Sequence, residues 1–233
     1  MSSQTRPLLI SFSGIDGAGK STQIERLHAR LQQAGLRVLR LAFWDNVVVL
    51  PRFRAGISHK VLGGELGIGS PEKPVARYDK NARKWYLMLA RSPLYFFDVL
   101  SLRKVVTAAR SRDTDVIIFD RYIYDQLAVL PGHALGRAYL RFLLNLAPRP
   151  DLAYLLDADP EAAIKRKPEY PLDFMRRYRK SYLKLAPLAP EMVVVPPLDV
   201  EGVERSIADE FTKRFALRRG HPEQLPDVQQ ISA

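Results

Sequence analysis

Apolar residues recur along the chain in two spacings, and each spacing predicts one kind of secondary structure. Short, predominantly apolar runs are typical of strands buried on both faces of a parallel sheet. Five such runs lie at residues 8–12, 37–43, 115–119, 152–156 and 192–195. Longer stretches with apolar residues three or four apart predict helices. These stretches lie at residues 21–33, 79–112, 134–146, 160–167, 172–185 and 200–217.

The alternation of strands and helices predicts an α/β fold of three layers, with a five-stranded parallel sheet and helices on both of its faces. Right-handed crossovers follow, and ligands are expected at the carboxyl ends of the strands. Residues 1–217 are predicted to form one domain, because no linker or internal repeat divides them. Residues 218–233 are polar and predict a flexible tail.

Three stretches have a less regular pattern. Residues 85–106 are apolar nearly all round a helix, which predicts burial on several sides, in part by a second subunit. Pro93 is expected to kink this helix or to split it in two. Residues 44–56, with Arg52 and Arg54, are expected to form a loop or short helix. Residues 63–74, with four glycines and two prolines, predict an irregular surface segment.

The strongest chemical signal lies between the first strand and the first helix. Residues 14–21 read Gly-Ile-Asp-Gly-Ala-Gly-Lys-Ser, which fits the phosphate-loop pattern G-x-x-x-x-G-K-[ST] without a mismatch. Glycines let the backbone close round a triphosphate, which the loop N–H groups and the positive helix end attract. A glycine turn without a ligand is the alternative, and the flanking strand and helix argue against it.

The loop predicts a site for Mg²⁺-ATP. Lys20 is expected to reach the β- and γ-phosphates, and the Ser21 hydroxyl is expected to ligate Mg²⁺. The predicted nucleotide-binding residues are Gly14, Ile15, Asp16, Gly17, Ala18, Gly19, Lys20, Ser21 and Thr22.

Two further candidates end the third strand. Asp120 is expected to hold Mg²⁺ opposite Ser21, and the alternative is a cap for the following helix. Arg121 is expected to hold the phosphate of an acceptor with its planar fork, and the alternative is a surface ion pair.

A basic cluster follows the fourth strand. Asp159, Pro160 and Glu161 have the composition of a helix start, and the helix ends at Lys165-Arg166-Lys167. Three adjacent bases usually form a solvated face. Here they are placed to form a lid, at residues 165–172, that closes over the phosphates. The predicted catalytic residues are thus Lys20, Asp120, Arg121, Arg166 and Lys167.

Composition narrows the classes of partner. The net charge of +11 suits anionic ligands, and nucleotides suffice for it, although it also serves solubility. No basic stripe with interleaved aromatics is present, so no nucleic-acid partner is expected. The absence of cysteine excludes disulfides and thiolate chemistry. Since no run has the length of a membrane span and residues 1–6 are polar, we expect a cytoplasmic protein.

Three blocks of the sequence resemble the thymidylate kinase-like branch of the P-loop nucleoside monophosphate kinases. They are Phe-Ser-Gly-Ile-Asp-Gly-Ala-Gly-Lys-Ser-Thr at residues 12–22, Phe-Asp-Arg-Tyr at 119–122, and Pro-Asp-Leu-Ala-Tyr-Leu-Leu-Asp-Ala-Asp-Pro-Glu at 150–161. The resemblance runs from residue 8 to about residue 217. It implies a P-loop kinase fold, ATP and Mg²⁺, a lid over the phosphates and often a homodimer.

The resemblance also implies transfer to a nucleoside monophosphate, most simply thymidylate (dTMP to dTDP). Asp16 matches the family's loop acid, which reaches toward the acceptor sugar. Members with glycine after that acid, as Gly17 is here, tend to carry their catalytic base in the lid, where Arg166 lies.

The chain departs from the family around the acceptor. Phe-Trp-Asp-Asn stands at residues 43–46 in place of an Arg-Glu-Pro-Gly stretch, and residues 57–78 have no counterpart. In the family an arginine after the matching aspartate helps to hold thymidylate, but here Asp98 is followed by Val99. Arg91 or Arg103 is expected to take over this role.

Two other functions therefore stay open. One is phosphorylation of a deoxynucleoside, sugar or lipid alcohol, with Asp16 as the nearest carboxylate base. The other is a non-catalytic ATP-binding protein. From their position in the chain, residues 196–199 are predicted to contact adenine.

Overall fold

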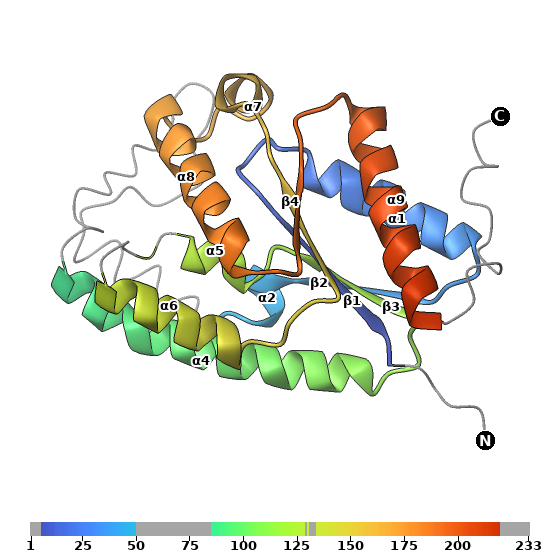
Figure 1. Cartoon of the computed structure of the whole chain (residues 1–233), viewed down its shortest axis with the longest axis horizontal. Helices are drawn as coiled ribbons and strands as arrows, with labels where there is room; N and C mark the ends of the chain where they lie inside the picture. Colours follow the sequence, from blue (N-terminus) through green and yellow to red (C-terminus); the bar gives the residue numbers. More distant parts are fainter. Residues whose placement is uncertain (1–5, 50–84, 129, 131–133, 220–233) are drawn as a thin grey trace.

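A parallel sheet of five strands forms the centre of the molecule (Figure 1). The computed structural model describes residues 6–49, 85–128, 130 and 134–219. The strands follow the order β2-β3-β1-β4-β5, and every neighbouring pair is parallel, as the sequence predicts. Their bounds are β1 Leu8–Ser13, β2 Val38–Ala42, β3 Val116–Asp120, β4 Leu152–Leu156 and β5 Met192–Val195.

Helices cover both faces of this sheet (Figure 1). On one face lie α1 (Lys20–Gln33) and α9 (Val200–Arg219). The other face carries α2 (Phe43–Asn46), α4 (Trp85–Arg110), α5 (Ile123–Leu127), α6 (Ala134–Leu146) and α8 (Leu172–Leu185). The short helix α7 (Pro160–Arg166) follows β4, and a 3₁₀ turn, Ala186–Leu188, follows α8.

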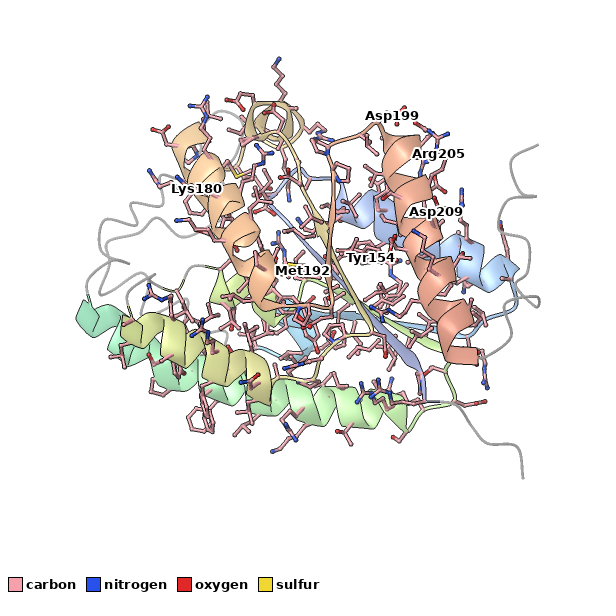
Figure 2. The ribbon with its side chains drawn as sticks, in the orientation of Figure 1. Tyr154, Lys180, Met192, Asp199, Arg205 and Asp209 are labelled. Atoms are coloured by element: carbon pink, nitrogen blue, oxygen red, sulfur yellow. The ribbon has the colours of Figure 1, made fainter. Side chains whose placement is uncertain are left out.

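The apolar strand runs are explained by two hydrophobic clusters, one on each face of the sheet. Along β1, Leu8, Ile10 and Phe12 belong to the cluster shared with α1 and α9, whereas Leu9 belongs to the cluster shared with α4, α5 and α6. Tyr154 of β4 reaches the α9 side, where its hydroxyl donates to the carbonyl of Ile207 at 2.9 Å (Figure 2). Both faces of each central strand are therefore buried, which removes the polar alternation of a half-exposed strand.

Most predicted elements are confirmed, several with an end shifted by one or two residues, and four differences stand out. The predicted second strand is too long, because Phe43 begins α2 with its ring buried. The helix α5 lies where no element was predicted. The long helix α4 is not split, since it passes through Pro93, which lies on an exposed part of its surface. The last helix extends beyond the predicted residue 217 to residue 219.

Several sequence predictions lie outside the described residues. They concern residues 50–84, which include Arg52, Arg54 and the segment 57–78, and residues 220–233 of the tail. Within the described residues, no helix combines the length and the apolar character needed to cross a bilayer.

The carboxyl ends of three strands bring the candidate residues to one edge of the sheet. The phosphate loop follows β1, Asp120 ends β3 with Arg121 directly after it, and α7 follows β4. The backbone N–H of Arg121 donates to the carbonyl of Phe12 at 2.9 Å. The ends of β1 and β3 therefore stay side by side at this edge of the sheet. This is the edge at which parallel α/β sheets bind ligands.

Candidate active site

The phosphate loop needs its glycines for two physical reasons. Gly14, Gly17 and Gly19 have φ values of 140°, 79° and 86°, a region that side chains disfavour. A Cβ atom on Gly14 would lie 2.6 Å from the carbonyl oxygen of Leu156, and one on Gly17 would lie 2.4 Å from that of Ala163. The loop is therefore packed directly against the end of β4 and against α7.

Lys20 is a buried cation at the first position of α1. Its Nζ donates to the carbonyl oxygens of Gly14 at 2.9 Å and Ile15 at 2.8 Å. Burial lowers the pKa of Lys20 from 10.5 to about 8, and the charge of Arg121 lowers it further, against the opposing effect of nearby carboxylates. An anion in the loop favours the charged form of Lys20, which is what a triphosphate would supply.

The start of α1 fits a phosphate group. Among the described residues no side chain caps this helix, and its first turn carries no acidic residue. The N–H groups of that turn and the helix dipole are thus directed at the loop. Ser21 and Thr22, which follow Lys20, are exposed at this point.

Asp120 lies close enough to Lys20 for its negative charge to raise the pKa of that lysine. The alternative role of Asp120, as a cap for the next helix, is wrong: Asp125 supplies that carboxylate, because the N–H of Tyr122 donates to its Oδ2 at 3.1 Å. Ser21 and Asp120 offer the hydroxyl and carboxylate oxygens that Mg²⁺ prefers. The residues therefore fit Mg²⁺ with a nucleotide, and Ser21 and Asp120 remain its predicted ligands.

Arg121 is held between two carboxylates. Its Nη1 donates to Oδ1 of Asp125 at 3.0 Å, and its Nη2 pairs with Oδ1 of Asp16 on the phosphate loop. The side chain is 18% exposed, so the alternative of a surface ion pair is wrong. Burial alone would lower the pKa of the guanidinium, but the charges of Asp125 and Asp16 together outweigh it and raise the pKa.

The backbone of Arg121 is also unusual. Its φ of 63° makes it the one non-glycine residue with a positive φ among the described residues. Such a conformation costs about 1–3 kcal/mol and persists only where the surroundings enforce it. The Arg121 backbone is held by the hydrogen bond from its N–H to the carbonyl of Phe12, and its guanidinium is held by the two carboxylates.

Asp125 is a residue at the centre of this group that the sequence analysis did not identify. Besides Arg121 and the N–H of Tyr122, it accepts hydrogen bonds from Ser13 Oγ at 2.6 Å and from the Tyr182 hydroxyl at 2.7 Å. Its side chain is fully buried. The sequence signal for it was weak: it is an acid four residues after Arg121, and the two pair although Arg121 precedes the helix that carries Asp125.

Two tyrosines of α8 complete this group. The Tyr178 hydroxyl donates to the backbone carbonyl of Asp125 at 2.7 Å, while Tyr182 contacts the carboxylate. The rings of Tyr178 and Tyr182 lie 4.7 Å apart. Burial and the charge of Asp125 raise the pKa of both hydroxyls, so they remain protonated donors.

The basic residues of the predicted lid lie apart from this group. Nε of Arg166 donates to the carbonyl of Ala162 on its own helix at 3.3 Å, and Nζ of Lys167 pairs with Glu169 at 3.1 Å. The structure thus brings together Asp16, Lys20, Asp120 and Arg121, and it leaves both lid side chains exposed. The helix start predicted at Asp159 is confirmed, since its Oδ2 accepts from the N–H of Ala162 at 2.9 Å.

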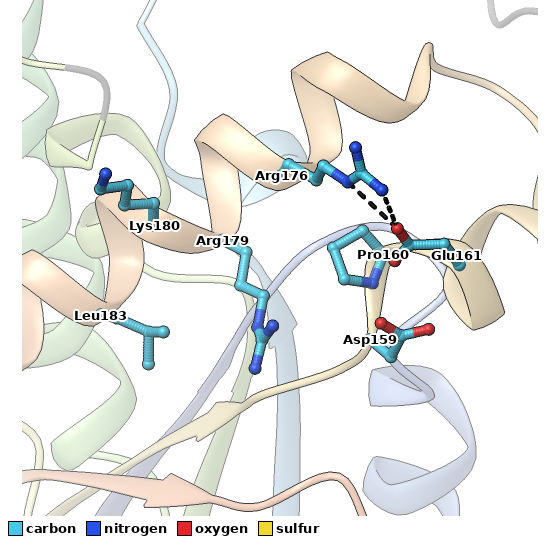
Figure 3. A pocket seen from close by; sticks show the side chains of 7 residues that line it. All are labelled: Asp159, Pro160, Glu161, Arg176, Arg179, Lys180 and Leu183. Carbon is cyan, nitrogen blue, oxygen red and sulfur yellow. Dashed lines mark hydrogen bonds and ion pairs between the residues drawn. The ribbon is translucent and has the colours of Figure 1, made fainter.

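A hollow of about 310 Å³ lies between α7 and α8 and contains none of the predicted site residues (Figure 3). It is lined by Asp159, Pro160, Glu161, Arg176, Arg179, Lys180 and Leu183. Its two arginines already have partners: Arg176 reaches Glu161, and Arg179 holds both oxygens of Asp157 at 2.6 and 2.7 Å. These ion pairs fasten α8 to α7 and to the end of β4.

The departures around the acceptor have structural counterparts. Arg103 donates to the carbonyl of Leu146 at 2.9 Å and ties α4 to α6, and its replacement of the missing arginine stays a prediction. Val99 is part of the core, and Asp98 is buried and accepts from the N–H of Val49 at 2.8 Å. The side chain of Arg91 lies outside the described residues.

The predicted adenine loop, residues 196–199, leads into α9. Asp199 stands at the head of that helix and accepts from the N–H of Gly202 at 2.8 Å (Figure 2). Gln23 of α1 donates to the carbonyl of Val200 at 2.9 Å, which joins this loop to the helix that follows the phosphate loop. A place for adenine beside the loop stays a prediction.

Comparison with known proteins gives one consistent result. The chain is 31% identical over 210 residues to a protein of Thermococcus kodakarensis named "Probable thymidylate kinase", with 86% of this chain and 95% of that protein covered. It is 30% identical over 194 residues to a thymidylate kinase of Bifidobacterium longum subsp. infantis, with 78% and 76% covered. A similarly named protein of Methanosphaera stadtmanae is 27% identical over 215 residues, with 90% of this chain and 100% of that protein covered. No family model matches the chain.

Proposed function

Because the chain belongs to the thymidylate kinase family, we propose that it transfers the γ-phosphoryl group of Mg²⁺-ATP to thymidylate, which gives thymidine diphosphate and ADP. The observation that supports this most directly is that Lys20 lies in a phosphate loop whose acid, Asp16, pairs with Arg121. One cation serves the donor and the other serves the acceptor. Their distance from bulk water strengthens both interactions.

The donor is held by the loop and by Lys20. The loop N–H groups bind the phosphates, and Lys20 exchanges its two carbonyl acceptors for phosphate oxygens. Ser21 and Asp120 would hold Mg²⁺, which would neutralise charge on the phosphates. The positive end of α1 adds to this stabilisation.

The acceptor is held by Arg121. Its planar fork matches the oxygens of a monophosphate, and Asp16 is the group that leaves Nη2 when the phosphate arrives. The acceptor oxygen is already a nucleophile, so no strong general base is needed. Catalysis rests on alignment and on stabilisation of the migrating group.

The lid residues supply the remaining positive charge. Arg166 lies three residues after Ala163, whose carbonyl touches Gly17, so the helix that carries it is seated on the phosphate loop. Reorientation of Arg166 from its own helix toward the phosphates would place its fork at the migrating group. Lys167 is the second candidate for this role.

We expect Arg166→Met to lower kcat by about 10²–10³-fold, because one charge that stabilises the transition state is removed. The KM for ATP should change little, since the loop and Lys20 still bind the donor. Steady-state kinetics with Arg177→Met as the control, which removes an exposed arginine of α8, measures this. Equal kinetics for the two variants would remove Arg166 from the catalytic residues.

We also propose a homodimer formed through α4 and α6. Phe97 and Phe142 are each 50% exposed, and the ring of Phe96 lies between them, with centroid distances of 5.8 and 6.2 Å. An exposed aromatic patch on a long apolar helix marks an interface.

The expected result is sedimentation at twice the chain mass of 26.5 kDa, with dissociation of the Phe97→Asp and Phe142→Asp variants to that mass. Leu188→Asp, which charges an exposed leucine elsewhere, should leave the dimer intact. A wild-type protein that sediments as a monomer at micromolar concentration would contradict the dimer.

The function is tested by ADP release with Mg²⁺-ATP across a panel of acceptors. The panel holds the nucleoside monophosphates, thymidine, simple sugars and a short isoprenoid alcohol. Saturable turnover on thymidylate supports the proposal. Turnover on an alcohol with none on thymidylate would replace the acceptor, and ATP binding without any transfer would favour a non-catalytic protein.

A further inference from the structure

The two terminal nitrogens of the Arg121 guanidinium bind carboxylates that differ in burial and in the number of their other hydrogen bonds. Nη1 binds Asp125, whose side chain is 0% exposed, and Nη2 binds Asp16, whose side chain is 16% exposed and belongs to the phosphate loop. Asp125 is further fixed by donors from three other residues, Ser13, Tyr122 and Tyr182. One end of the fork is therefore anchored, and the other faces the nucleotide loop.

We propose that Asp125 is a positioning residue that anchors Nη1 of Arg121 and so presents Nη2 to the phosphate of the acceptor. This inference rests on the proposed function, in which Arg121 binds that phosphate. Asp125 itself touches no substrate, because its oxygens are taken up by protein donors and its side chain is fully buried. It acts only through Arg121.

The need for an anchor follows from the length of the Arg121 side chain. A long side chain beside a ligand site otherwise samples several rotamers. The Asp125 carboxylate selects one orientation, since it lies four residues along the chain at a fixed place in α5. Acceptor binding then does not have to order the guanidinium.

The anchor also joins Arg121 to the helix after the lid. Tyr182 binds the Asp125 carboxylate, and Tyr178 binds its backbone carbonyl, both from α8. This helix begins at Leu172, where the lid segment 165–172 ends. The acceptor clamp and the lid therefore share one support, and a weakened Tyr182 contact should affect the acceptor in the same direction as loss of Asp125.

The experiment compares Asp125→Asn and Tyr182→Phe with Tyr124→Phe. Tyr124 is the matched control because it is a buried tyrosine of α5 that also donates to a carboxylate, that of Glu191, and it does not contact Arg121. Thermal unfolding first establishes that each variant is folded. Initial rates are then measured with thymidylate and ATP varied separately.

We expect Asp125→Asn to raise the KM for thymidylate by about tenfold or more and to lower kcat, because the guanidinium is no longer fixed. The KM for ATP should stay within about threefold, and Tyr182→Phe should show a smaller change of the same kind. Tyr124→Phe should behave as the wild type. Equal losses toward both substrates, or an Asp125→Asn variant no different from Tyr124→Phe, would overturn the proposal.

A second readout does not depend on activity. Arginine side-chain NMR of the wild type should show hindered rotation for one guanidinium, assigned to Arg121 by its loss in Arg121→Lys. In Asp125→Asn that signal should exchange freely. If the wild type fails to phosphorylate thymidylate, the proposed function is wrong but the anchor is still tested. If the signal persists in Asp125→Asn, the anchor is wrong whatever the kinetics show.

Discussion

Lys20→Met is expected to lose phosphoryl transfer by at least about 10³-fold while it makes the fold more stable at neutral pH. Activity falls because the variant lacks the cation that binds the β- and γ-phosphates. Stability rises because Lys20 is buried and, within the part of the chain that the structure describes, its hydrogen-bond acceptors are two neutral carbonyl oxygens of the loop. A methionine fills the same volume without a charge.

The gain in stability should depend on pH in a defined direction. The pKa of Lys20 is about 8 in the folded protein and 10.5 ordinarily, so between these values the folded state binds fewer protons than the unfolded state. The free energy of unfolding of the wild type therefore rises as the pH rises from about 8 to 10.5. Below pH 8 the penalty is complete and amounts to roughly 3 kcal/mol.

Urea unfolding of wild type and Lys20→Met across this pH range measures the effect. The advantage of the variant should be largest below pH 8 and should shrink toward pH 10.5. Lys180→Met, which removes an exposed lysine of α8, is the control. An active Lys20→Met enzyme, or one less stable than the wild type at neutral pH, would contradict this account of the loop.

Gly17→Ala has the second-largest expected effect. The new Cβ would lie 2.4 Å from the carbonyl oxygen of Ala163, and φ at this position is 79°. Either the loop or α7 must move, so we expect transfer to fall by more than about 10²-fold and the free energy of unfolding to fall by roughly 2–4 kcal/mol. Steady-state rates and urea unfolding measure the two losses.

Gly35→Ala separates backbone strain from the clash. Gly35 has a φ of 74°, close to that of Gly17, and no atom lies within 4 Å of its added Cβ. This variant should lose only about 1 kcal/mol and keep full activity. If Gly17→Ala matched it in stability and rate, close packing between the loop and α7 would not matter for the enzyme.

The sheet was predictable because strands that are buried on both faces appear in the sequence as short continuous apolar runs. The strands at residues 152–156 and 192–195 and the helices at 134–146 and 172–185 have the predicted bounds. The helix α5 has only five residues, too few for a helical period to show. The helix α4 continues through Pro93 and packs against α6, and tertiary contacts of this kind can override a local preference that the sequence shows.

The site was predictable where chemistry is local in the sequence. The phosphate loop and the pair Asp120-Arg121 follow from contiguous motifs and from their places after strands. Asp125 was not predictable, because its partners Ser13 and Tyr182 are 112 and 57 residues away. The contact that Arg166 makes with the carbonyl of Ala162, four residues earlier on its own helix, leaves no mark in the hydrophobic pattern, so the direction of this side chain could not be read from the sequence.

The most direct test of the central claim is to follow the labelled γ-phosphate of ATP with Mg²⁺ and thymidylate. The account predicts that the label appears on the β-phosphate of thymidine diphosphate, at a rate that saturates with thymidylate and is lost in Lys20→Met. Label that remains in ATP, or that appears only as inorganic phosphate in wild type, would contradict transfer to thymidylate.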